Sequence, residues 1–430
     1  MYLTGRFFAL VALGAVPVIV WPHYLTALAW VFGCLVLLGI DVLAAGSTTA
    51  VTVRRSPTDP IRLGQSTSST IVVDNPGTRR FRGQLRDAWQ PSAGATGNVH
   101  ALDIPAGERR AVHTVLTPTR RGDRLGLRVT VRRRGPLGLA GRQRGLPMPG
   151  FIRALPPFGS RRHLPSRLAR LRQLDGRSAV RIRGQGTEFD SLRDYVEGDD
   201  VRSIDWRATA RRRSVVVRTW QPEKDRHIVI VLDTSRTSAG RVGDTPRLDA
   251  AMDAALLLAA LASHAGDRVD LIAGDRRVHS RVVGVTGSDL LSSLVNAMST
   301  LEPALLEADW PMLGAEVTKL SRQRALLVLL TPLEPAAVEE SLLPPLSVLA
   351  KRYRVVIGSV ADPALGDLIE QRDDAREVYG AAAAARTTLL RNRTATAVGR
   401  LGVDVVDAEP DKLPAALADH YLTLKSRGLL

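Results

Sequence analysis

Three runs of consecutive apolar residues limit the folds open to the second half of this 430-residue chain. They cover residues 227–233, 325–331 and 354–360. A strand that is apolar on both sides is buried on both faces, which is usual in parallel sheets. Segments of helical length separate the runs, among them residues 247–265, which end before a glycine. The pattern therefore predicts a doubly wound α/β domain over residues 226–430, with helices on both faces of the sheet.

Two uncharged apolar runs, residues 7–21 and 25–40, lie near the N-terminus. Each is close to the shortest segment that crosses about 30 Å of bilayer hydrocarbon at a rise of about 1.5 Å per residue. A Trp-Pro-His-Tyr turn joins them, which predicts a transmembrane helical hairpin over residues 1–46 with aromatic side chains at the interface. The alternative is a cleaved signal peptide, which Pro22 and His23 disfavour because they make a poor cleavage site.

Most of the positive charge lies in the first half of the chain. Residues 1–225 contain 36 Lys and Arg against 17 Asp and Glu, whereas residues 226–430 contain 23 against 26. Arg6, Arg54 and Arg55 flank the apolar runs, so the positive-inside rule predicts that both ends of the hairpin and the soluble domains are cytoplasmic. We attribute the basic excess to attraction to anionic lipid headgroups. Because no nucleic-acid-binding motif accompanies it, nucleic acid is not an expected partner.

The sequence changes character twice between the apolar runs and the α/β domain. Residues 47–150 contain short segments rich in Val, Thr and Leu that alternate apolar and polar residues, separated by turn signals such as Asn75-Pro76-Gly77. Short alternating strands of this kind predict an all-β sandwich. Residues 151–225 are rich in Arg and Pro and predict a connector with one short helix.

A pattern typical of cation binding follows the first predicted strand of the α/β domain. Asp233, Ser235 and Thr237 form a D-x-S-x-T sequence at the carboxyl end of that strand, where open α/β sheets place their ligands. One carboxylate and two hydroxyls can converge on a hard cation such as Mg²⁺ or Mn²⁺. The spacing resembles that of a von Willebrand factor A domain. A local role stays open, because Asp233 and Ser235 can also cap the segment that follows.

The resemblance to a von Willebrand A domain implies two further ligands, a Thr from a later loop and an Asp just after the fourth strand. Residues 307–310 stand in that loop and read Glu-Ala-Asp-Trp, so Asp309 is the candidate there. Pro332 stands where the Asp is expected, and Glu334 follows two residues later. One carboxylate and two hydroxyls bind Mg²⁺ weakly. The sequence therefore favours a degenerate, metal-free site over an occupied one.

A charged and aromatic segment joins the connector to the α/β domain and carries the most distinctive motifs of the chain. It contains G-x-G-T-E-F, L-R-D-Y-V-x-G-D-D-V-R-x-I-D-W and A-T-A-R-R between residues 184 and 212. Its acids can form bidentate pairs with Arg193, Arg202 and Arg211, which we expect to lock the α/β domain against the β region. The candidate signature and interaction residues are Gly184, Gly186, Glu188, Phe189, Arg193, Tyr195, Gly198, Asp199, Asp200, Arg202, Asp205, Trp206 and Arg211.

These motifs resemble the signature of the bacterial domain-of-unknown-function family numbered fifty-eight, and the resemblance extends over nearly the whole chain. Members of that family are membrane proteins associated with MoxR-type AAA+ ATPases. The resemblance implies a cytoplasmic adaptor or scaffold anchored in the bacterial plasma membrane. Its implied partners are such an ATPase and other membrane proteins, and its implied role is in the assembly, maturation or remodelling of other proteins.

A different class of function is a metal-dependent ligand-binding or adhesion module, which needs a complete cation site and usually an exposed location. An enzyme is not expected. His227, His264 and His279 fall on separate predicted elements, and the sequence has no G-x-x-x-x-G-K-[ST] phosphate loop. The single cysteine excludes an intramolecular disulfide and a cysteine-based zinc cluster.

Overall fold

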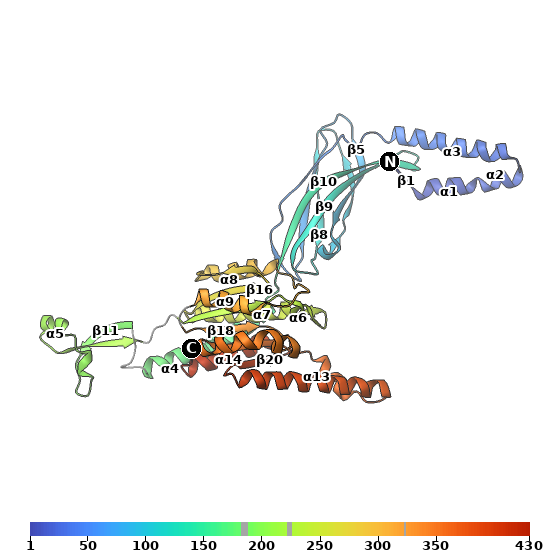
Figure 1. Ribbon diagram of the computed structural model, residues 1–430. Helices are drawn as coiled ribbons and strands as arrows, with labels where there is room; N and C mark the ends of the chain where they lie inside the picture. The colour runs from blue at the N-terminus through green and yellow to red at the C-terminus, as the bar shows by residue number, and fades with distance from the viewer. Residues whose placement is uncertain (182–187, 222–225, 322–323) are drawn as a thin grey trace. The chain divides into compact units, whose positions relative to one another are not determined.

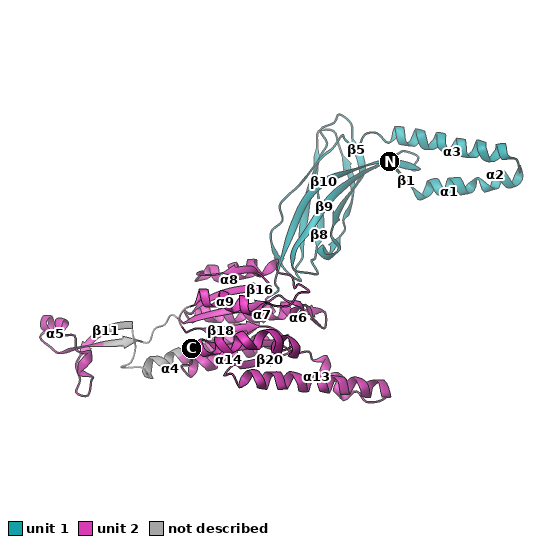
Figure 2. Cartoon of the chain, viewed as in Figure 1, with its two compact units in different colours: residues 1–157 teal, residues 158–430 magenta. Residues whose placement is uncertain are grey.

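The computed structural model describes residues 1–181, 188–221, 226–321 and 324–430. The chain divides into two compact units, Met1–Pro157 and Phe158–Leu430 (Figure 2). The first unit holds apolar N-terminal helices and a strand-rich region, and the second holds a mixed sheet with helices. Each unit has a hydrophobic core of its own.

Three apolar helices open the first unit (Figure 1): α1 (Gly5–Leu13), α2 (Ala15–Val20) and α3 (Tyr24–Ala44). Among the described residues, α3 is the one helix long and apolar enough to cross a membrane. The segment Gly5–Val20 is apolar but shorter. An apolar N-terminal helix is therefore present as predicted, whereas the second span of the predicted hairpin is not shown.

Two sheets form the strand-rich region. The first contains β1 (Tyr2–Leu3), β10 (Ala140–Leu155), β9 (Gly122–Arg134), β5 (Phe81–Trp89) and β7 (Val99–Ile104) in that order, with β3 (Ile61–Arg62) paired to β10. The second contains β2 (Thr52–Arg55), β4 (Thr67–Asp74), β8 (Arg109–Leu116) and β6 (Ala95–Thr96). The pairings are antiparallel except that of β3 with β10.

The two sheets share one core through their inward-pointing side chains. Ile71 and Val73 of β4 pack with Leu85 of β5 and Val131 of β9, and all four are fully buried. Buried residues alternate with more exposed ones along β4, as the period-two pattern predicts. Residues 151–155 were predicted as the start of the connector, but they belong to β10 because they continue its pairing with the neighbouring strands.

A buried ion pair joins the two sheets inside this core. Arg55 of β2 donates to both carboxylate oxygens of Asp87 of β5, at 2.7 and 3.3 Å. The Arg55 side chain is 5% exposed and that of Asp87 is 0% exposed. Trp89 donates its indole N–H to the same carboxylate at 2.8 Å, and Ser69 accepts from Arg55 at 2.8 Å. These partners offset the cost of taking both charges out of water, so the pair fixes how the sheets face each other.

A buried carboxylate connects α3 to the strand-rich region. Asp41 lies in the last turn of α3 and is fully buried. It accepts the backbone N–H groups of Leu137, Leu139 and Ala140 at 2.7, 2.7 and 2.8 Å. These residues belong to the β9–β10 turn and the first position of β10. Because three N–H donors satisfy an ionised carboxylate, an acid is tolerated at the end of an otherwise apolar helix.

The second unit is built on a six-stranded sheet. Its strand order is β17 (Val278–Val282), β16 (Arg268–Gly274), β13 (His227–Asp233), β18 (Leu326–Leu330), β19 (Arg354–Val360) and β20 (Asp404–Ala408). The strands are parallel except β17, which pairs antiparallel with β16 at the edge. The three continuous apolar runs of the sequence form β13, β18 and β19, which lie inside the sheet, where both faces are covered.

Helices cover both faces of this sheet (Figure 1): α7 (Arg247–His264), α8 (Ser288–Ser299), α9 (Trp310–Leu320), α11 (Leu343–Arg352), α13 (Ala375–Gly399) and α14 (Leu413–Ser426). Val229 and Val231 of β13 share a core with Leu313 of α9 and Leu346 of α11. On the other face, α7 packs against α14 and against β13, β16 and β19. The helix α13 runs through Gly380 without a break.

The connector contributes a longer helix to the second unit than the sequence predicts. The helix α4 spans Leu164–Arg181. Its Arg167 and Arg170 form ion pairs with Asp419 of α14 at 2.8 and 2.7 Å. The connector from Phe158 to this helix is therefore part of the α/β unit.

The Asp41 joint predicts a stability defect. Replacing Asp41 with Ala removes the acceptor of three backbone N–H groups, which should lower the free energy of unfolding of the first unit by about 2–3 kcal/mol. The measurement is urea unfolding of the full chain in detergent, followed by tryptophan fluorescence. Asp59→Asn is the matched control, because Asp59 is exposed. An Asp41→Ala transition that coincides with that of the control contradicts the assigned role.

Candidate functional site

The candidate site lies where the strand order of the second unit reverses. The chain passes from β13 to β16 on one side and later crosses to β18 on the other side. Ligands of open α/β sheets bind outside the carboxyl ends of the strands at such a switch point. Asp233 ends β13, and Thr331 directly follows β18, so the predicted D-x-S-x-T loop and Thr331 meet at this position.

Asp233 is buried among hydrogen-bond donors. Its Oδ1 accepts the backbone N–H of Ser235 at 2.8 Å, and its Oδ2 accepts the hydroxyls of Thr331 and Thr237 at 2.7 and 3.1 Å. Burial raises the pKa of the Asp233 carboxyl, and the hydrogen bonds from Thr331, Ser235 and Thr237 oppose this rise. Only 1% of the surface of Asp233 is exposed, so the raised pKa follows from the loss of hydration.

The oxygen atoms of the loop have the spacing of neighbouring ligands around a small cation. Thr237 Oγ1 lies 3.0 Å from Ser235 Oγ and 3.1 Å from Asp233 Oδ2. Adjacent ligands of an octahedral Mg²⁺, each at about 2.1 Å from the ion, are about 3.0 Å apart. The structure therefore brings the three predicted ligands together, with Thr237 Oγ1 between the Ser235 hydroxyl and the single carboxylate, that of Asp233.

The two acids considered as further ligands have other positions. Asp309 is exposed and caps α9 by accepting the backbone N–H of Met312 at 2.9 Å. Glu334 is exposed and precedes the short helix α10 (Pro335–Ala337). The position after β18 is filled by Thr331, whose hydroxyl binds Asp233 directly. Within the described residues, no group of three or more His, Cys, Asp and Glu side chains could hold a metal ion.

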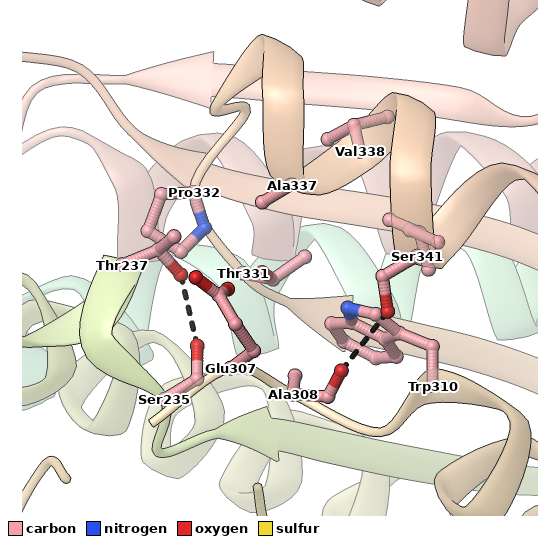
Figure 3. Close-up of a pocket in the computed structure, with 11 residues that line it drawn as sticks. Ser235, Thr237, Glu307, Ala308, Trp310, Thr331, Pro332, Ala337, Val338 and Ser341 are labelled. Carbon is pink, nitrogen blue, oxygen red and sulfur yellow. Dashed lines mark hydrogen bonds between the residues drawn. The ribbon is translucent and has the colours of Figure 1, made fainter. Parts of the chain in front are cut away.

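A small pocket lies beside the loop and contains an acid that the sequence did not single out. Ser235, Thr237, Glu307 and Thr331 lie on its wall, with Trp310 at its other end (Figure 3). Its cavity volume is about 10 Å³, the space that one water needs. Glu307 forms an ion pair with Arg236 of the same loop. The pocket therefore has room for a water or an ion.

A second polar network supports the loop from the neighbouring strand. Thr234 donates its hydroxyl to Asp275 at 3.2 Å, and His279 Nε2 lies 2.8 Å from the same carboxylate oxygen. The backbone N–H of Thr234 also donates to Gly274 at 3.0 Å. The sequence marked Gly274 and Asp275 only as a turn. The network could not be found from the sequence, because Thr234 lies about forty residues from the hairpin that contains Gly274, Asp275 and His279.

The described signature residues form a small folded unit, here called the signature unit (residues 188–221). In it β11 (Glu188–Asp194) pairs antiparallel with β12 (Val216–Gln221), and η3 (Val201–Ser203) and α5 (Trp206–Arg212) lie between them in the chain. Among the residues of the unit whose side chains are described, Val216 and Val217 are buried. Gly184 and Gly186 lie outside the described residues, and so do the side chains of Glu188 and Phe189.

Ion pairs hold the loops of the signature unit together. Arg193 donates to Asp199 at 2.5 Å, and this bond, helped by the backbone N–H of Val196, holds the pKa of the Asp199 carboxyl below its usual range. Asp205 pairs with Arg218 at 2.9 Å. Of the three arginines expected to pair with the acids, Arg193 does so among the described residues, with Asp199, whereas Asp205 pairs with Arg218 because the strand β12 brings that residue beside the start of α5.

The remaining acids and the glycine of the signature shape its turns. Asp205 accepts the backbone N–H groups of Arg207 and Ala208 at 3.0 Å each, so it caps α5. Asp200 accepts the N–H of Arg202 at 3.0 Å and starts η3 in the same way. Gly198 has φ 105°, a conformation that a side chain would strain. These three residues therefore have local structural roles.

Comparison with known proteins identifies the class of this chain. Residues 191–397 match the family described as "Protein of unknown function DUF58". The chain therefore belongs to the DUF58 family over the segment that begins in β11 and includes the Asp233 loop. This agrees with the resemblance carried by the signature motifs.

The curated relatives are mycobacterial. An uncharacterized protein of Mycobacterium tuberculosis and one of Mycobacterium bovis are each 27% identical to this chain over 185 residues. The match covers 42% of this chain and 57% of each relative. The chain thus spans a little over half the length of the curated relatives that it matches.

Solved structures resemble parts of the chain only distantly. The Deinococcus radiodurans RO (RSR) protein is 17% identical at a TM-score of 0.24, with 49% of this chain and 36% of that chain covered. The PapD-like domain 7 of human CEP192 is 14% identical at a TM-score of 0.18, with 25% and 87% covered. At these TM-scores the likenesses say nothing about the function of this chain.

The raised pKa of Asp233 predicts a pH-dependent effect of Asp233→Asn. The folded chain holds the proton at pH values where the unfolded chain, with a carboxyl pKa of about 3.9, has released it. Wild-type stability therefore falls as pH rises from that value to the raised folded pKa. Asn carries no charge, so its stability does not fall in this way. The free energy of unfolding of the variant should therefore increase relative to that of the wild type over this window, by about 1.4 kcal/mol for each unit by which folding raises the Asp233 pKa.

The measurement is the midpoint of thermal unfolding of both proteins between pH 4 and pH 8. Asp411→Asn is the control, since Asp411 is exposed, and its difference from the wild type should not grow across this range. A difference for Asp233→Asn that shrinks as pH rises would show that the carboxylate is stabilised in the folded chain.

Proposed function

We propose that this protein is a non-enzymatic scaffold anchored in the bacterial plasma membrane, whose α/β unit is a von Willebrand A-like protein-binding module that serves a MoxR-type AAA+ ATPase. The soluble parts are cytoplasmic in this proposal. The ATPase partnership comes from the resemblance of the signature motifs to a family with that association. The A-like assignment is supported by the D-x-S-x-T loop at the switch point of the sheet.

The observation that carries the scaffold proposal is the geometry of the first unit. Asp41 binds the N–H of Ala140 at the first residue of β10, so α3 and this end of the strand form one joint. β10 has 16 residues, and at about 3.3 Å per residue it extends roughly 50 Å. The chain leaves the unit at Pro157, just beyond the far end of this strand.

A stiff spacer follows from this geometry. The strand β10 is paired along its length with β9, and the two sheets are fixed by a packed core and by the Arg55–Asp87 pair. Such a body does not bend as a flexible linker does. A membrane helix joined to one end of a stiff body suits a membrane-anchored spacer, and the chain continues from the other end of that body into the α/β unit.

The proposal predicts recovery of an AAA+ ATPase with the full chain. The chain is expressed with an affinity tag in its own bacterium, extracted from membranes in mild detergent, and purified with and without a non-hydrolysable ATP analogue. A MoxR-type ATPase should be enriched in proportion to the bait and identified by mass spectrometry. A tagged, unrelated membrane protein is the control. Failure to enrich any AAA+ ATPase in either nucleotide state counts against the partnership.

A second candidate is a metal-dependent ligand-binding module, favoured by the spacing of the Asp233, Ser235 and Thr237 oxygens. A divalent cation stabilises the ionised form of Asp233, so Mg²⁺ or Mn²⁺ should raise the thermal midpoint of the wild type in a saturable way at pH 8. Asp233→Asn should abolish that rise, and Asp411→Asn should keep it. A rise of equal size in all three proteins contradicts a cation at this loop.

A further inference from the structure

Several charged side chains of the signature unit bind other parts of the same unit. Arg193 pairs with Asp199, and Arg218 pairs with Asp205. Asp200 caps η3 by accepting a backbone N–H. These contacts join residues of the unit to each other. The paired charges therefore explain how the unit folds, and they do not indicate which partner it binds.

Three apolar residues of the same motif are exposed to solvent. Trp206 is 69% exposed, Val201 is 63% exposed and Val196 is 61% exposed, while Val216 and Val217 fill the interior. Trp206 is the first residue of α5. An exposed tryptophan loses favourable burial of a large apolar surface. Trp206 does not contribute to the interior of its unit, so its place in the motif needs another reason.

Exposed arginines flank this tryptophan in the chain. Within the described part of the chain, Arg202, Arg207 and Arg211 are exposed and form no side-chain ion pair. Arg207 follows Trp206 directly, and Arg211 lies one turn further along α5. Tryptophan and arginine are the residue types most enriched at the energetic centres of protein interfaces. The short helix α5 therefore presents an exposed tryptophan and, on the neighbouring side, two exposed arginines with no ion pair among the described residues.

We propose that the signature unit is a protein-docking surface for an acidic partner, in which Trp206 enters an apolar pocket of the partner and Arg207 and Arg211 pair with its carboxylates. The positive charge of these two arginines favours a partner with negative charge at the contact. The proposal goes beyond the scaffold function and does not require that the partner is the ATPase.

The composition of the unit favours a protein over a membrane or a nucleic acid. Residues 191–218 contain seven Arg but also five Asp and Glu. Exposed acids such as Glu197 and Asp200 repel a continuous array of phosphates, whereas a protein can place its charges one by one. The helix α5 has seven residues, about two turns, which is short for a helix that lies in the bilayer interface.

Site-specific photocrosslinking in cells tests the proposal with the full chain. Benzoylphenylalanine replaces Trp206 in one protein and Tyr379 of α13 in a matched control, because Tyr379 is also an exposed aromatic residue of the second unit (79% exposed). We expect one discrete protein adduct at position 206, identified by mass spectrometry as a protein with a net acidic surface, and no such adduct at position 379. The partner is then purified for direct binding.

Charge-reversal variants provide the second part of the test. Arg207→Glu with Arg211→Glu should remove the adduct at position 206 and weaken binding of the purified partner at least about tenfold. Arg376→Glu, at an exposed arginine of α13, should leave both unchanged. Trp206→Ala should weaken binding to a similar degree without changing the thermal midpoint, since the side chain is exposed.

Several outcomes overturn the proposal: no adduct at position 206, an adduct within the same chain, an adduct to lipid or RNA, or a protein adduct that survives charge reversal. An adduct with an AAA+ ATPase supports both the docking surface and the proposed function. An adduct with a different acidic protein that meets the charge-reversal test supports the docking surface and counts against the ATPase as its occupant.

Discussion

A single carboxylate at the end of an apolar helix fixes the first unit. Asp41 would be costly in that position without partners, because an ionised group loses its hydration when it is buried. Three backbone N–H groups of the β9–β10 turn region replace that hydration. The helix end and the β region therefore form one joint. The long strand β10 starts at this joint, and this sets how far from it the chain emerges.

A second buried carboxylate, Asp233, is satisfied by different chemistry. Its donors are two hydroxyls and one backbone N–H. A backbone N–H can only donate, as around Asp41, whereas a hydroxyl can also turn a lone pair toward a cation. Protein donors alone therefore satisfy the Asp233 carboxylate, and two of them are hydroxyls, which are also groups that a hard cation binds. The raised pKa of the Asp233 carboxyl reflects burial, which the hydrogen bonds from Thr331, Ser235 and Thr237 only partly oppose.

The signature unit separates structural from interacting residues in a way that its motif does not reveal. Acids and arginines dominate the motif, yet the pairs they form close the unit on itself. Among the described residues, the exposed Trp206 and the exposed Arg207 and Arg211 of the same helix take no part in these pairs. A charged motif is usually interpreted as the interacting part of a segment. Here the burial and pairing of each side chain assign that role to Trp206 and its neighbours.

The sequence by itself determined the strands of the α/β sheet and the loop at Asp233, because continuous apolar runs and the D-x-S-x-T spacing are local patterns. It also identified the family from contiguous motifs. Only the tertiary structure decided that Asp41 binds a turn about a hundred residues away, that Thr331 completes the bonding of Asp233, and that Asp205 pairs with Arg218. Each of these contacts joins segments that are separate in the chain, and their proximity depends on strand pairing and packing that no local pattern records.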